Sequence, residues 1–161
     1  MKHLLLLCLA FTSALPAAAQ EVSLGIGYSD FARPDATDDV AIALEAQSRP
    51  LALGDRAYLA LAGATVVQAK GDLWIGAGLA IRLQPEEQWF FEISSMPGYY
   101  REASVGTELG GAFQFRTLLA IGRNLGEGRH VALAATHKSN ANFAPKNPGV
   151  NTVLLRYGFG F

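Results

Sequence analysis

The feature that most constrains this chain is a two-residue alternation of side-chain size along most of its length. Large apolar residues take every second position, with Gly, Ala or scattered charged residues between them. Successive side chains of a β-strand point to opposite faces, whereas an amphipathic helix needs apolar residues about 3.6 positions apart. The alternating stretches are residues 22–28, 40–45, 58–67, 73–82, 89–94, 109–121, 131–137 and 153–161. We therefore expect an all-β protein of about eight strands.

Turn-forming residues separate these stretches and set the domain organisation. Gly, Pro and Asp interrupt the alternation because they favour turn conformations and weaken strands. The expected turns are residues 33–35, 48–50, 70–72, 84–86, 97–98, 125–128 and 147–149. Composition does not shift along the chain after its first nineteen residues. We expect one domain that covers residues 20–161.

The two faces of the expected strands differ in a way that favours a membrane barrel. A soluble sandwich or a lipocalin-like barrel would bury its large apolar face, but its second face would not usually be so rich in Gly and Ala. In an eight-stranded barrel the interior is just wide enough for side chains to fill it. Small inward residues leave room for charged ones to pair there, while the bulky face contacts lipid. The charged residues expected inside are Glu45, Arg82, Glu92, Arg116 and Arg156.

Strand length and the need for closure complete the prediction of the fold class. A tilted strand of about 9–11 residues crosses a bilayer, and closing the sheet satisfies every backbone hydrogen-bonding group in hydrocarbon. We therefore predict an eight-stranded antiparallel transmembrane β-barrel of the bacterial outer membrane, a multi-pass protein. Both termini would then lie on the periplasmic side.

The N-terminal segment has the features of an export signal. Lys2 is followed by an apolar run of leucines, and Ala17, Ala18 and Ala19 form an A-x-A-like cleavage site. We expect residues 1–19 to be a signal peptide. Cys8, the single cysteine, falls within it, so neither disulfides nor thiol chemistry is expected in the mature chain.

The charge balance and the C-terminus also bear on the partners. Of the 13 basic residues the expected signal holds one, which leaves 12 against 14 acidic residues. This balance gives no electrostatic reason to expect nucleic acid binding. The closing run from Val153 to a terminal Phe161 resembles the C-terminal signature of bacterial outer-membrane proteins. We expect Phe161 to be recognised by the barrel assembly machinery.

A polar cluster near the C-terminus is the candidate site. His137 and Ser139 continue the outward, odd-numbered series of one strand, and Asn151 has the same parity in the next. Paired residues on one face of a sheet lie about 4.5–5.5 Å apart between Cβ atoms, so the three side chains can converge at the outer-leaflet rim. Serine needs a neighbouring base, usually histidine, and a third group orients that base. No carboxylate follows Glu127, so Asn151 is the local candidate for the third group.

The end of the same strand offers groups to stabilise an oxyanion. Asn140, with Ala141 beside it, follows Ser139 at the start of the loop. Backbone N–H groups at a strand end, together with an amide side chain, can hold a developing negative charge. A plainer reading takes His137 and Ser139 as two polar residues that enter a surface loop.

The run His137-Lys138-Ser139-Asn140-Ala141, followed by Asn147-Pro148-Gly149 and an aromatic closing strand, resembles the PagL-type lipid A 3-O-deacylases. The resemblance implies an outer-membrane esterase that cleaves the 3-linked acyl ester of lipid A in lipopolysaccharide. It makes Ser139 the nucleophile, His137 the base and Asn140 an oxyanion contributor. The third member of the family's site, best known as a glutamate, falls on Asn151. The family requires no metal and no cofactor, and none is expected here.

Two other functions stay open at this point. A non-catalytic barrel of the OmpA or OmpX kind, with a structural or adhesive role, would need no outward His-Ser pair. A relative that hydrolyses phospholipid esters would keep the chemistry but change the substrate. The sequence also leaves open whether the barrel acts as a monomer or as a homodimer.

Overall fold

The computed structural model describes residues 19–31, 38–103 and 106–161 and places nine β-strands in them. The strands are β1 (Ala19–Phe31), β2 (Asp39–Ser48), β3 (Leu51–Gly54), β4 (Ala57–Gln68), β5 (Leu73–Leu83), β6 (Trp89–Arg101), β7 (Phe113–Gly126), β8 (Arg129–Ser139) and β9 (Val150–Gly160). The described residues contain no helix long and apolar enough to cross a membrane. Residues 1–18 of the expected signal peptide and the expected turn at 33–35 lie outside the described residues.

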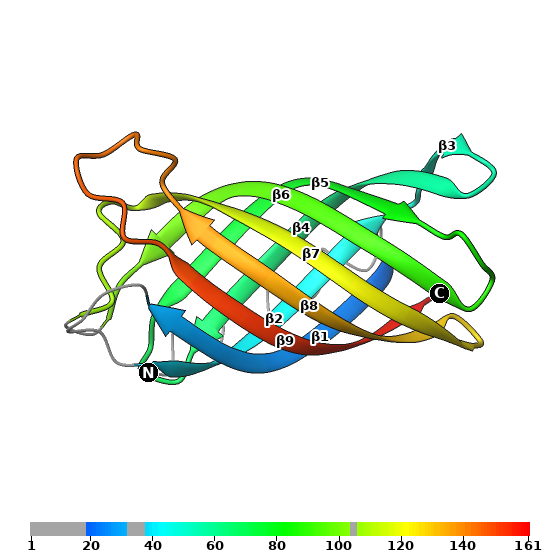
Figure 1. Ribbon diagram of the computed structural model, residues 1–161, viewed down its shortest axis with the longest axis horizontal. Coiled ribbons are helices and arrows are strands. Elements are labelled where there is room, and N and C mark those ends of the chain that lie inside the picture. Colours follow the sequence, from blue (N-terminus) through cyan, green and yellow to red (C-terminus); the bar gives the residue numbers. More distant parts are fainter. Residues whose placement is uncertain (1–18, 32–37, 104–105) are drawn as a thin grey trace.

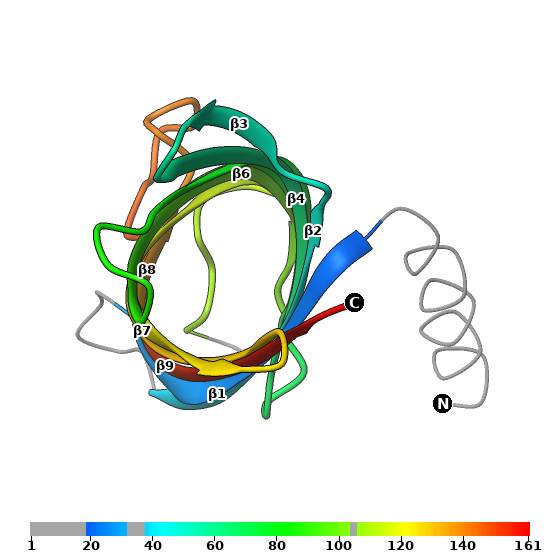
Figure 2. The same cartoon turned by 90° about the vertical axis from the view of Figure 1, so that its right-hand side faces the viewer.

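Eight of these strands close into a barrel, as the alternation predicts. Neighbours pair antiparallel in the order β2-β1-β9-β8-β7-β6-β5-β4, and β2 also pairs with β4, which closes the ring. The end-on view shows this ring, with β3 outside it against the end of β4 (Figure 2). β3 was not expected, since the sequence predicts only a turn at residues 48–50.

Two further boundaries differ from the prediction. The expected turn at Pro97-Gly98 is wrong, because β6 runs through both residues. Pro97 has no N–H to donate to a neighbouring strand. In the β5–β6 ladder the pairing passes from Gly76–Gly98 directly to Leu79–Ser95, so Pro97 has no ladder partner on β5. The strand expected from residue 109 begins only at Phe113. Leu109 is fully buried instead of facing outward.

The alternation itself places side chains as predicted. Large residues such as Leu24, Leu133 and Leu155 are more than half exposed, at 55%, 55% and 57%, on the outer face. The lumen is filled by alanines together with a few large side chains. One of them, Trp74, packs where Gly76 and Gly98 leave space, since a Cβ on either glycine would come within 2.4 Å and 2.6 Å of its ring. The interior is a packed core and not an open channel.

The predicted ion pairing inside the barrel is confirmed. Arg116 contacts Glu45 at 2.7 Å, and Arg156 lies between Glu45 and Glu92 at 3.2 and 2.9 Å. The remaining pairs join Arg82 to Glu92 and to Glu21, each at 2.6 Å. Three arginines thus neutralise three buried or half-buried glutamates, as a charge in a water-poor interior requires.

The two ends of the barrel are unequal. The C-terminus, the β3 hairpin and the short β7–β8 turn lie at one end, and the long loop between β8 and β9 lies at the other (Figure 1). The loop that precedes β7 folds over the lumen at this second end, where Tyr100 Oη donates to Thr107 O at 2.8 Å and Leu109 is fully buried. The candidate residues lie at the end with the long loops.

Candidate functional site

His137 and Asn151 form the centre of the site. They are directly paired across β8 and β9 and both are exposed on the outer face. His137 Nδ1 lies 2.8 Å from Asn151 Oδ1, which is a full hydrogen bond when the ring nitrogen donates. An Nδ1–H tautomer leaves the lone pair of Nε2 free to act as a base. The structure therefore brings together two of the three residues that parity predicted to converge.

Ser139 follows on the same face as the last residue of β8. It is half-buried and paired with Phe115 on β7. Two residues along a strand span about 6.6 Å, and among the described residues no hydrogen bond joins the Ser139 hydroxyl to the His137 ring. Catalytic hydrogen bonds are often long in unliganded enzymes and tighten only with substrate. Ser139 thus lies on the same outer face as His137, two residues further along β8.

Asn140, at the start of the loop between β8 and β9, holds this loop in place through its hydrogen bonds. Its side chain is buried, and Nδ2 donates to Leu109 O at 3.1 Å and to Lys146 O at 2.6 Å. Its Oδ1 accepts from Asn142 N at 3.0 Å, and its own N–H donates to Asn147 Oδ1 at 2.9 Å. The donors of Asn140 are therefore engaged by Leu109, which precedes β7, and by the β8–β9 loop, and its buried side chain points away from the face that carries Ser139.

Ala141 differs from Asn140 in this respect. It is exposed, has a left-handed φ of 52°, and its N–H makes no hydrogen bond within the described residues. It is two residues from Ser139. The backbone amide of Ala141 is the group of this pair that remains available to an oxyanion.

The sequence predicts a turn at Gly149 and assigns it no place in the candidate site, but the structure places it against the ring of His137. A Cβ on Gly149 would come within 2.9 Å of His137 Cε1 and 3.4 Å of Nε2. Its φ is 73°, which favours glycine. The signal that could have identified it is the Pro-Gly pair two residues before Asn151, which brings the loop back over the end of β8.

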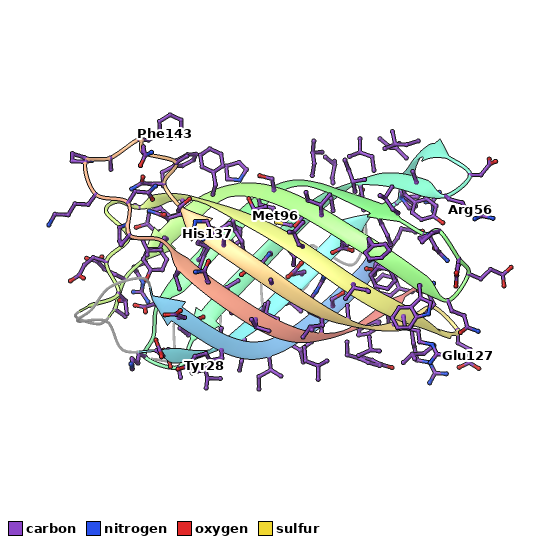
Figure 3. The ribbon with its side chains drawn as sticks, in the orientation of Figure 1. Tyr28, Arg56, Met96, Glu127, His137 and Phe143 are labelled. Atoms are coloured by element: carbon purple, nitrogen blue, oxygen red, sulfur yellow. The ribbon has the colours of Figure 1, made fainter. Side chains whose placement is uncertain are left out.

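Aromatic side chains border the site on its β7 side. Phe143, which is 75% exposed, lies with its ring centroid 6.0 Å from that of Phe115 and 6.3 Å from that of Phe113. His137 and Phe143 appear at the same end of the barrel, far from Arg56 and Glu127 at the other (Figure 3). Aromatic residues are enriched at membrane–water interfaces, and this cluster lies beside the serine.

An apolar groove of about 590 Å³ runs along the outer face below the site. Ala135, two residues before His137, lies between its ladder partners Leu119 and Val153 and lines the groove with them. A methyl group between two larger side chains leaves a hollow there. Leu133 lines the groove as well.

Comparisons with known proteins agree with this arrangement. The sequence profile of the family described as lipid A 3-O-deacylase (PagL) matches residues 45–160, which include His137, Ser139 and Asn151. No match is found among the curated proteins.

Three solved structures share the fold. The outer membrane enzyme PagL superposes with a TM-score of 0.69 at 16% identity, over 88% of this chain and 99% of that one. A de novo designed transmembrane β-barrel gives 0.59 at 10% identity, over 88% and 93%. Neisserial surface protein A gives 0.56 at 9% identity, over 88% and 95%. These similarities confirm the predicted eight-stranded barrel, and the profile match confirms the resemblance found in the residues. The chain belongs to the lipid A 3-O-deacylase (PagL) family.

Proposed function

We propose that this chain is an outer-membrane esterase that hydrolyses the 3-O-linked acyl ester of lipid A. The observation that carries the proposal is the hydrogen bond of 2.8 Å between His137 and Asn151 on the outer face. Ser139 lies two residues beyond His137 on the same face of β8. An outward histidine with an oriented ring serves no purpose in lipid contact, where polar groups are costly. Family membership supports the same chemistry.

The reaction follows from the roles of three groups. Ser139 Oγ attacks the ester carbonyl while its proton passes to His137 Nε2, and the carbonyl oxygen becomes an oxyanion that the Ala141 N–H stabilises. The intermediate collapses with cleavage of the ester C–O bond, and His137 returns the proton to the departing sugar hydroxyl. Water, deprotonated by His137, then cleaves the acyl-serine. The products are a free fatty acid and lipid A with a free 3-hydroxyl group.

The position of the site suits a substrate held in the membrane. With the termini in the periplasm, the end with the long loops is extracellular, and the site lies at the level of the outer leaflet. An acyl chain of lipid A would occupy the apolar groove beside Ala135 while its ester reaches Ser139. In the same orientation Phe161 lies at the periplasmic end and is 61% exposed, so the barrel assembly machinery could reach it. The finished barrel would act as a monomer or as a homodimer.

Mass spectrometry of lipid A tests the proposal. A Gram-negative host whose lipid A carries a 3-O-linked chain should lose one hydroxyacyl group when it expresses this chain, and should keep it with Ser139→Ala or His137→Gln. Ser95→Ala is the matched control, because Ser95 is an exposed serine of the same outer face, paired with Thr117. Unchanged lipid A with a folded wild-type barrel would exclude this substrate.

Two rival functions give other outcomes in the same cells. A purely structural or adhesive barrel would leave Ser139 unreactive toward a serine-directed phosphonate. A phospholipid esterase would react with the phosphonate and release fatty acid from glycerophospholipids while lipid A stayed intact.

A further inference from the structure

A row of polar residues crosses four strands at the level of the site. The ladder partners are Thr117 on β7, His137 on β8, Asn151 on β9 and Asp30 on β1. Asp30 is exposed, and it continues the outward series of Leu24, Ile26 and Tyr28 along β1. A carboxylate, which the C-terminal region lacks, is therefore supplied one strand beyond Asn151 by the opposite end of the chain.

The geometry allows Asn151 to connect His137 with Asp30. Asn151 Oδ1 is turned toward β8 by its contact with His137. In a planar amide the two Nδ2 protons then lie on the opposite side, and β1 is the strand on that side. Directly paired residues have Cβ atoms about 4.5–5.5 Å apart, which one carboxylate and one amide can bridge.

A neutral amide can present either its oxygen or its NH₂ group to a histidine, whereas an ionised carboxylate presents only acceptor oxygens. If Asn151 turned its NH₂ group toward His137, Nδ1 would have to accept, the proton would move to Nε2, and the ring could not act as a base toward Ser139. An ionised carboxylate on the far side accepts hydrogen bonds only, so it selects the orientation in which NH₂ faces β1 and Oδ1 faces the ring.

We propose that Asp30 is a positioning residue for the esterase. Its carboxylate accepts a hydrogen bond from Asn151 Nδ2, holds Oδ1 toward His137, and keeps the imidazole in the Nδ1–H tautomer. A carboxylate from the adjacent strand is thereby coupled to the histidine through an amide. The kinetic part of this inference rests on the proposed function; the tautomer part does not.

Other charged groups near the row are few and differently engaged. On the outer face Tyr28 lies two residues before Asp30 and donates from its hydroxyl to Asp38. On the inner face of β8, Lys138 is fully buried and faces Tyr100 at 5.5 Å from the ring centre. Asp38 provides a matched control, since it is an exposed carboxylate of the same region that is outside the ladder row.

A kinetic double-mutant cycle tests the coupling. In the wild-type background Asp30→Asn should lower kcat about tenfold with little change in KM, because one directing hydrogen bond is lost far from the substrate. The acid limb of the kcat profile should move to lower pH. In an Asn151→Glu background, where a carboxylate contacts His137 directly, Asp30→Asn should have no such effect. Equal losses in both backgrounds, or an equal loss with Asp38→Asn, would overturn the proposal.

Nitrogen NMR of histidine-labelled protein in micelles gives a readout that needs no catalysis. The ring of His137, assigned with His137→Gln, should be the Nδ1–H tautomer in the wild type and a mixture in Asp30→Asn, with Asp38→Asn unchanged. An identical tautomer in wild type and Asp30→Asn would refute the role of Asp30. A protein that showed the tautomer change but hydrolysed no ester would instead refute the proposed function and leave the positioning role standing.

Discussion

Gly149 lies so close to the ring of His137 that a single added methyl group would touch it. The distance from an added Cβ would be 2.9 Å to Cε1 and 3.4 Å to Nε2, the atom expected to take the proton from Ser139. The ring of His137 is thus held between the backbone of the β8–β9 loop at Gly149 and the side chain of Asn151.

We predict that Gly149→Ala lowers the deacylation rate at least tenfold while the barrel still folds. The added methyl displaces the ring, and the left-handed φ of 73° adds strain of about 1–2 kcal/mol. Rates of lipid A deacylation in micelles give the measurement, with heat-modifiable gel mobility as the check on folding. Gly126→Ala is the control, because Gly126 has a comparable φ of 86° but nothing within 4 Å of its added Cβ. Similar losses in both variants would mean that backbone strain alone is responsible.

A second prediction concerns Asn140. Asn140→Ala should speed cleavage by trypsin after Lys146 and reduce activity, because the side chain connects the carbonyls of Leu109 and Lys146. Mass spectrometry of the fragments follows the cleavage. Asn124→Ala, which removes a similar bond to Glu87 O at the opposite end of the barrel, should leave this site resistant. Lost activity with unchanged cleavage would instead favour a direct oxyanion role for Asn140.

The ion pairs of the lumen lead to a third prediction. Arg156→Met should lower the free energy of unfolding by about 3–5 kcal/mol, since it leaves Glu45 and Glu92 buried with one partner fewer. Arg129→Met should cost less than about 1 kcal/mol, because the side chains of Arg129 and Glu127 are 47% and 82% exposed. Urea unfolding in detergent micelles, followed by tryptophan fluorescence, compares the two. Equal midpoints would show that water reaches the lumenal pairs.

A fourth prediction uses the packing of Phe90 against its ladder partner Gly122. A Cβ on Gly122 would come within 2.1 Å of Phe90 Cζ. Gly122→Ala should therefore destabilise the barrel by about 1–3 kcal/mol, and Phe90→Leu should relieve part of that cost in the double variant. The same urea titration measures the coupling. Strictly additive losses would indicate that the ring moves aside freely.

Much of the fold and part of the site follow from local sequence. Because strand parity is set by a two-residue period, it places Trp74, Glu45 and Arg116 inside and His137 and Ser139 outside. The same parity turns Asn140 inward, where its buried side chain donates to the carbonyls of Leu109 and Lys146.

The rest depends on contacts between distant parts of the chain. Pro97-Gly98 has the composition of a turn, yet a gap in the β5–β6 ladder accommodates it within a strand. The pairing of β1 with β9 joins residues more than 100 positions apart, so the alignment of Asp30 with Asn151 could not be read from the sequence. Leu109 is buried because the loop before β7 folds over the lumen, which no local pattern predicts.

The position of β9 has a consequence for the assembly of the barrel. β9 pairs with β8 along one edge and with β1 along the other, so it is the seam at which the first and last strands meet. The row that contains Asn151 crosses this seam, and the apolar groove is part of the closed outer face. A chain still in transit, with its sheet open, therefore has an incomplete site. The alignment of Asn151 with Asp30 therefore arises only when β1 and β9 pair and the barrel closes.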